Sequence, residues 1–103
     1  MSSVGLHVGR AKLSPDTIKT HYAITSMMEE LEAADWYRQR ADDREDDTLR
    51  DVLLHNMREE IEHASILIEW LRRNNEHFAK QLKTYLFTEA PILDLEHKSE
   101  GKG

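Results

Sequence analysis

Two long helical segments joined by a short acidic link constrain the fold of this sequence most strongly. Ser14-Pro15-Asp16-Thr17 has the pattern of a helix start, because serine caps, proline suits the first helical position and aspartate favours the positive end of the helix dipole. The first helix is expected to reach about Arg40, and a second to run from about Asp47 to Arg73. Each has about 26 residues and a length on the order of 40 Å at a rise of about 1.5 Å per residue. The link over residues 42–47 is so short that the helices must lie antiparallel.

The remainder of the chain predicts smaller elements. Asn75 can cap a third, shorter helix that ends near Phe87, and a further turn is expected through Leu95. Residues 1–13 are expected to form a flexible arm, 14–96 the helical hairpin domain and 97–103 a flexible tail. The predicted fold class is therefore all-α, an antiparallel two-helix hairpin plus a short C-terminal helix.

Composition limits the kinds of partner. The 103 residues include no cysteine, so any metal must be held by oxygen and imidazole ligands. Twenty acidic against fourteen basic residues give a net charge of −6, which disfavours nucleic acid and anionic membranes and favours cations. No stretch resembles a membrane span or a signal peptide, so a cytoplasmic protein is expected. A domain this small would gain stability from a partner chain.

One glutamate lies in the middle of the apolar face of each long helix. On a projection of about 100° per residue, the neighbours of Glu30 are Ala23, Met27, Ala34 and Tyr37, and those of Glu60 are Leu53, Met57, Ala64, Leu67 and Leu71. Neither face carries a lysine or arginine. Burying an ionised carboxylate without a compensating partner costs several kcal/mol, so both carboxylates must be protonated, paired or bound to a cation.

His63 follows Glu60 by three residues, and residues three apart lie over one spot on a helix. Alone, a buried glutamate is usually a protonated or water-bridged core residue, and a single Glu-x-x-His arises by chance in many helices. A carboxylate on one helix and a Glu-x-x-His on the next, both within apolar stripes, match half of a di-iron carboxylate bundle. Iron or manganese suits such ligands, whereas zinc could bind without turnover.

A complete site of this kind needs four helices, and this chain supplies two. Two copies related by a twofold axis would duplicate Glu30, Glu60 and His63, and so provide four carboxylates and two imidazoles. The four negative charges would balance two divalent cations. The sequence therefore predicts a homodimer that completes a four-helix bundle and whose association is linked to metal binding.

A second face of the first helix is also acidic. Glu29 and Glu32 are three residues apart, away from the Glu30 stripe, and Trp36 lies one turn beyond Glu32. This face could be a solvated surface with Trp36 in an interchain contact, or it could collect Fe²⁺ for the buried centre. Tyr37 could hydrogen-bond a ligand or simply pack.

Several ordered blocks of the sequence resemble the encapsulated ferritins from about His21 to Ile92. These blocks are Met28-Glu29-Glu30-Leu31-Glu32-Ala33-Ala34-Asp35-Trp36-Tyr37, His55-Asn56, Glu59-Glu60, Glu62-His63-Ala64, Glu69-Trp70-Leu71-Arg72-Arg73 and Thr84-Tyr85-Leu86-Phe87-Thr88-Glu89. The resemblance implies a ferritin-like ferroxidase that oxidises Fe(II) with O₂, with two iron ions per dimer interface. It further implies a ring-shaped decamer, a pentamer of dimers, housed in an encapsulin nanocompartment for iron storage.

The same resemblance implies roles for individual residues. Glu30, Glu60 and His63 would be the iron ligands with Tyr37 nearby, and Glu29, Glu32 and Trp36 would form a site on the route of the metal, where Ca²⁺ or another divalent cation could also bind. Family members usually end in a linker and a short peptide that docks to the shell; residues 99–103 do not show that peptide. The alternative function is a non-catalytic, metal-stabilised oligomeric helical interaction module.

Overall fold

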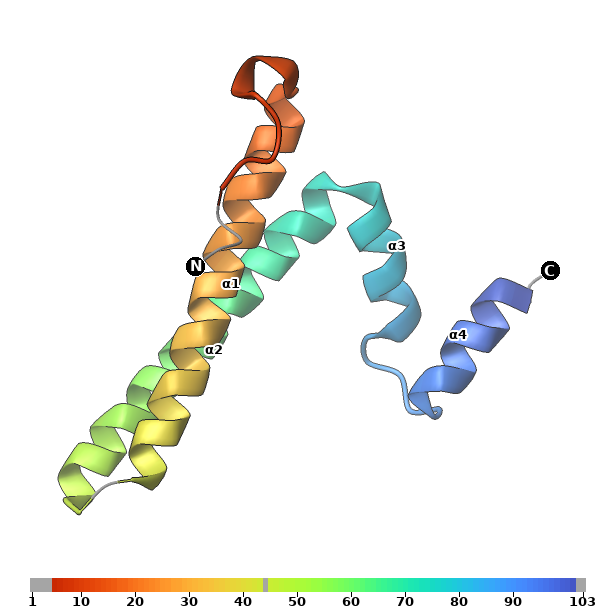
Figure 1. Ribbon diagram of the computed structural model, residues 1–103. Coiled ribbons are helices and arrows are strands. Elements are labelled where there is room, and N and C mark those ends of the chain that lie inside the picture. The colour runs from red at the N-terminus through yellow and green to blue at the C-terminus, as the bar shows by residue number, and fades with distance from the viewer. Residues whose placement is uncertain (1–4, 44, 102–103) are drawn as a thin grey trace. The chain divides into compact units, whose positions relative to one another are not determined.

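The computed structural model describes residues 5–43 and 45–101 (Figure 1). A short 3-10 helix, η2 (Arg10–Lys12), precedes four α-helices: α1 (Pro15–Asp42), α2 (Asp47–Asn74), α3 (Glu76–Tyr85) and α4 (Ile92–Gly101). No strand occurs in the described residues, and the all-α class predicted from the sequence is confirmed. Each of these helices is too short or too polar to cross a lipid bilayer.

The chain divides into two compact units, Met1–Trp70 and Leu71–Gly103. The first unit is the predicted hairpin, in which α1 and α2 run antiparallel and side by side (Figure 1). The second contains the end of α2 together with α3 and α4, which lie against each other. Helix α2 begins in the first unit and ends in the second. The candidate ligands Glu30, Glu60 and His63 all lie in the first unit.

Side-chain caps fix where the helices begin. The Thr17 amide donates to Ser14 Oγ (3.1 Å) at the start of α1, and the amides of His77 and Phe78 donate to Asn75 Oδ1 at the start of α3. Both caps were predicted from the sequence. Asp46 was not, yet its Oδ1 accepts from the amides two and three residues on, at 2.8 and 3.1 Å, and caps α2.

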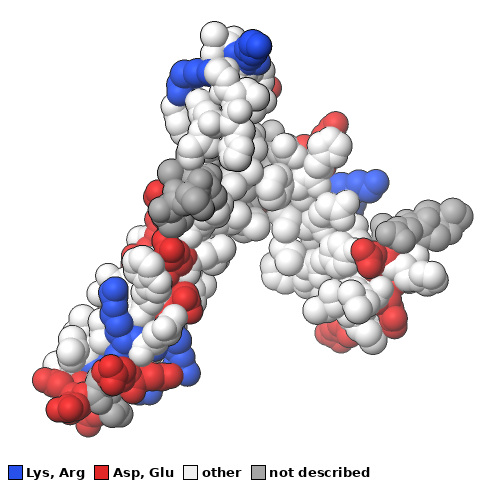
Figure 2. Space-filling view, viewed as in Figure 1, with Lys and Arg blue, Asp and Glu red and all other residues white. Residues whose placement is uncertain are grey.

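Acidic and basic side chains gather at the end of the hairpin where α1 meets α2 (Figure 2). Exposed aspartates and glutamates of the link, among them Asp42, Asp43 and Glu45, lie close in sequence to the exposed Arg38 and Arg40. Opposite charges side by side at a solvent-exposed turn favour solubility and contribute little to stability. The acidic link is therefore a solvated end of the hairpin, away from the middle of the helices.

The core of the hairpin is small and rich in alanine. Ala23, Ala34, Ala41 and Ala64 are buried, and these short side chains allow the two helix backbones to approach closely. Many large apolar side chains of the same unit stay exposed instead, namely Tyr22, Leu31, Trp36, Leu49, Val52, Ile61, Ile66 and Trp70. Exposed apolar surface of this extent is typical of a chain that packs against a partner.

The ends of the chain differ in detail from the sequence-based expectations. Residues 1–4 of the predicted arm and 102–103 of the predicted tail lie outside the described residues, but Arg10 donates to the Tyr22 hydroxyl (3.0 Å), which places η2 beside α1. The predicted turn through Leu95 is instead a helix that continues to Gly101. The predicted domain limits remain predictions.

Candidate metal centre

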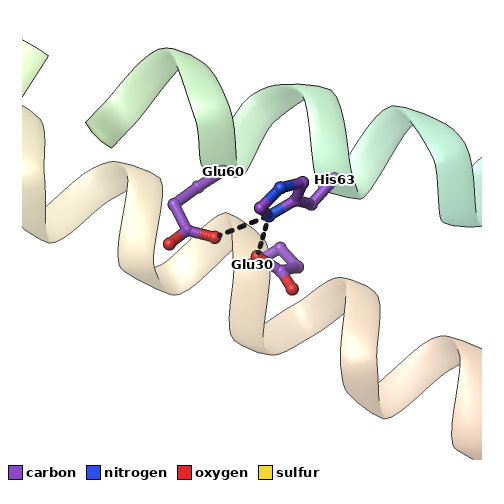
Figure 3. A group of neighbouring side chains, drawn as sticks. All are labelled: Glu30, Glu60 and His63. Atoms are coloured by element: carbon purple, nitrogen blue, oxygen red, sulfur yellow. Dashed lines mark hydrogen bonds and ion pairs between the residues drawn. The ribbon is translucent and has the colours of Figure 1, made fainter. Parts of the chain in front are cut away.

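The side chains of Glu30, Glu60 and His63 meet between the two long helices (Figure 3). Glu30 comes from the middle of α1, and the other two come from successive turns of α2. His63 Nδ1 lies 3.3 Å from Glu30 Oε1 and 3.4 Å from Glu60 Oε1. One ligand atom from each residue falls within 4.8 Å of the others, so a single cation could contact all three.

These three side chains are not buried within one chain, contrary to the expectation that both carboxylates point into an interior. The side chains of Glu30, Glu60 and His63 are 28%, 23% and 48% exposed. Two helices can surround a cluster on two sides only, so its remaining face is open to solvent. Within the described residues of a single chain, the cluster therefore lies in the seam between α1 and α2, and no other element covers that seam.

The electrostatics of the cluster reflect crowded negative charge. A hydrogen bond with Glu60, followed by partial burial and repulsion from the Glu60 charge, raises the pKa of Glu30 above its ordinary value. Partial burial alone would lower the pKa of His63, but hydrogen bonds to Glu30 and Glu60 and their charges outweigh this and raise it. The cluster thus holds protons more tightly than isolated groups would, as expected where a cation can take their place.

The donor set fits a divalent first-row metal. Two carboxylates and one imidazole are hard to intermediate ligands, which suit Fe²⁺, Mn²⁺ or Zn²⁺. Glu60 and His63 are one turn apart on the same helix, so they can bind one ion without moving the backbone. Three protein ligands leave coordination positions for further groups, and this is the one such cluster found among residues 5–43 and 45–101.

The second acidic face of α1 is less organised. Glu29 is exposed and Glu32 half-buried, and the structure does not join them to a third ligand in the described part of the chain. Trp36, 48% exposed, and the half-buried Tyr37 share a neighbour that sequence reasoning missed. The Arg40 guanidinium lies 5.7 Å from the Trp36 ring centroid and 5.9 Å from that of Tyr37, a cation–π arrangement.

Arg40 follows Trp36 by four residues and Tyr37 by three, and this spacing is the signal that could have revealed the contact. Tyr37 has its described contact with Arg40, so the structure places this tyrosine beside a cation rather than joining it to the three clustered side chains. A separate apolar hollow lies further along the hairpin and is lined by Lys19, Tyr22, Ala23, Ser26, Leu67 and Trp70. It contains no carboxylate, so it is unrelated to the cation chemistry of the cluster.

Comparison with known proteins agrees with this geometry. Residues 5–89 match the model of the EncFtn-like family. This chain belongs to the EncFtn-like family. An encapsulated ferritin-like protein of Rhodospirillum rubrum is 50% identical over 95 residues, which cover 92% of this chain and 68% of that protein. A ferritin-like protein of Thermotoga maritima is 48% identical over 79 residues, covering 77% and 69%.

The fold of the EncFtn-like chain is also found in a solved structure. A crystal structure of a Nitrosomonas europaea protein superimposes with a TM-score of 0.81 and 48% sequence identity, covering 85% of this chain and 97% of that one. Membership of the EncFtn-like family supports an iron-related, ferritin-like function. Glu30, Glu60 and His63 all lie within residues 5–89, which match the family model.

Proposed function

We propose that this EncFtn-like chain is a ferroxidase, which oxidises Fe(II) to Fe(III) with O₂ at a di-iron centre shared between two copies. The observation that carries the proposal is the cluster of Glu30, Glu60 and His63 at an uncovered seam of the hairpin. Iron is the substrate in this account. The protein provides ligands that hold two Fe(II) ions side by side, so that electrons can leave both for one O₂ molecule.

Ligand count supports the sharing of the site. One chain supplies two carboxylates and one imidazole, whereas ferritin-like di-iron bundles use four carboxylates and two imidazoles from four helices. Two hairpins about a twofold axis supply that full set. The four carboxylate charges then balance two Fe²⁺ ions. The protons that Glu30 and His63 hold more tightly, because of their raised pKa values, are released when the metal binds.

Exposure supports the same pairing. Large apolar side chains of the hairpin, including Leu31, Ile61 and Ile66, are exposed in one chain, and covering them would favour association at about 25 cal/mol per Å² of apolar surface. A second hairpin over the seam would also exclude water from the partly exposed carboxylates. Metal binding and pairing therefore stabilise each other, because the complete ligand set exists only in the pair.

Electron balance allows two products of oxygen reduction. Two Fe(II) ions give two electrons, which together with two protons convert one O₂ to one H₂O₂. Four Fe(II) ions, taken as two successive pairs, give four electrons and with four protons yield two waters. The carboxylates remain ionised in either case, and the neutral imidazole of His63 offers a ring nitrogen as a ligand.

Further parts of the proposal rest on family resemblance. Glu29, Glu32 and Trp36 would form a site on the path of the incoming metal, where Ca²⁺ or another divalent cation could also bind, and Tyr37 would lie close to the completed centre. The relative from Rhodospirillum rubrum is named as encapsulated, which supports a place inside an encapsulin nanocompartment. The ring-shaped decamer rests on family resemblance alone. Residues 14–96 would form the ferritin-like domain of each subunit.

Oxygen uptake on addition of Fe(II) tests the activity. The protein is expected to consume O₂ and form Fe(III) much faster than buffer does, and Zn(II) is expected to inhibit by occupying the same ligands. Binding of Fe(II) without faster oxygen uptake would contradict the ferroxidase and leave a non-catalytic, metal-stabilised interaction module.

A further inference from the structure

Two methionines flank the ligand cluster, one on each long helix. Met27 precedes Glu30 by three residues on α1, and Met57 precedes Glu60 by three residues on α2. Residues three apart on a helix are neighbours, with Cβ atoms roughly 5–6 Å from each other. Both methionines are half-buried. Each methionine is therefore a neighbour, on the surface of its own helix, of one of the clustered carboxylates.

The antiparallel helices place the two methionines at opposite ends of the cluster. Three residues toward the N-terminus is one direction along the hairpin on α1 and the reverse direction on α2. The pairing of Glu30 with Glu60 and His63 sets the register, so Met27 is level with about Ala64 and Met57 with about Ala34. Both alanines are buried, so the residue level with each methionine on the other helix has a short side chain.

Thioether chemistry suits this position for a particular task. Sulfur is a soft donor and competes poorly with carboxylates for Fe²⁺, so neither methionine displaces a ligand. Hydrogen peroxide, by contrast, oxidises methionine to its sulfoxide, and reductases reverse that change. A methionine beside a centre that produces peroxide would thus be consumed before less reactive neighbours.

We propose that Met27 and Met57 are the acceptors of hydrogen peroxide formed at the centre, and are modified to methionine sulfoxide during turnover. The inference rests on the proposed ferroxidase. Two Fe(II) ions reduce O₂ with two protons to H₂O₂; the O–O bond then breaks and an S–O bond forms. The sulfur loses two electrons, one peroxide oxygen stays on it, and the other leaves as water.

With a second hairpin over the seam, as the proposed function requires, peroxide formed at the centre would reach the two thioethers without crossing bulk solvent. Met28 provides a matched internal control, because it is also half-buried but lies two residues from Glu30, about 200° round the helix. Its sulfoxide content reports peroxide that has escaped to solution. Selectivity for Met27 and Met57 over Met28 is therefore the measurable signature of the proposal.

The test is an O₂ pulse given to the full chain loaded anaerobically with Fe(II), with catalase in solution to destroy escaped peroxide. Fe(III) formation is followed by absorbance and sulfoxide at each methionine by tandem mass spectrometry. Sulfoxide at Met27 and Met57 is expected to exceed that at Met28 by more than about fivefold, whereas H₂O₂ added to metal-free protein should modify all three within about twofold.

The outcomes separate the two proposals. Normal Fe(III) formation with no sulfoxide, or with sulfoxide spread evenly over the three methionines, would overturn this inference and leave the ferroxidase standing. Absence of Fe(III) formation would overturn both. As a second variant, Met27→Leu with Met57→Leu should keep the rate of iron oxidation but release at least about twofold more peroxide without catalase, since leucine has similar volume and no sulfur. Release equal to that of Met28→Leu would refute the inference.

Discussion

At the scale of single residues, the centre depends on three side chains that carry different charges as pH and metal change. Glu30 and His63 both have raised pKa values, and the side chains of both interact with that of Glu60. In the proposed function, a divalent cation would replace the protons on these groups and neutralise the carboxylates. We therefore expect the cluster to be stabilised by protons in acid and by metal near neutral pH.

Loss of one ligand should abolish fast iron oxidation. Glu60→Ala or His63→Ala is expected to lower the initial rate of Fe(III) formation by about two orders of magnitude or more, because a duplicated site loses two ligands at once. Circular dichroism should show nearly unchanged helix content. The exposed neighbour Glu59, changed to alanine, serves as the matched control and should retain the parent rate. Retained fast oxidation in His63→Ala would contradict the assignment.

The pH dependence of stability should reverse when metal binds. Because the pKa of His63 is raised in the fold, its protonation stabilises the metal-free fold fully below the ordinary value of 6.5. This stabilisation is lost as pH rises through the higher pKa of the folded state. The raised pKa of Glu30 disfavours the ionised folded form as pH rises above 4.5, which acts in the same direction. Tm is measured once with a chelator and once with bound Co²⁺. The first value minus the second should become more negative between roughly pH 5 and pH 8. A constant difference would contradict this linkage.

Glu32 should affect the route of the metal rather than the centre itself. Glu32→Ala is expected to slow Fe²⁺ uptake at limiting concentration, because clustered carboxylates raise the local cation concentration, while the metal content at saturation stays the same. Stopped-flow rates and the bound metal per chain, measured on the same sample, check both statements. An empty centre in this variant would instead make Glu32 a ligand.

At the scale of helices, the hairpin could be predicted because its start signals and apolar stripes are local. Ser14 and Asn75 were recognised as caps, but Asp46 was missed because an acidic run offers several capping side chains. The helix beyond Leu95 has no apolar period and could not be foreseen. The partial exposure of Glu30 and Glu60 was also missed, since a helix projection shows which face is apolar and not how many helices cover it.

Removing the cap of α2 should destabilise the hairpin measurably. Asp46→Ala leaves the amides of Thr48 and Leu49 without their acceptor, and the free energy of unfolding should fall by about 0.5–2 kcal/mol. Urea denaturation followed by circular dichroism measures the change. The exposed Glu45, one residue earlier, is the control, and Glu45→Ala should have a smaller effect. Equal losses in the two variants would mean that charge, not capping, matters.

At the scale of the whole molecule, the sequence indicated a pair of chains because two helices cannot complete a four-helix site. The exposed apolar side chains of the hairpin and the open side of the cluster fit that expectation. The proposed ring and compartment follow from no local pattern in the sequence. Both would depend on surfaces whose partners are other molecules, so the ring rests on family resemblance and the compartment on resemblance and the name of one relative.

Anaerobic titration of the full chain with Fe(II), with sedimentation recorded at each step, tests the shared centre most directly. The account predicts saturation at two iron ions per two chains, with a rise from single chains to pairs or multiples of pairs as metal is added. Removal of the metal with a chelator should reverse that rise in mass. Saturation with the mass still that of a single chain, or a mass independent of metal, would contradict a centre built from two copies.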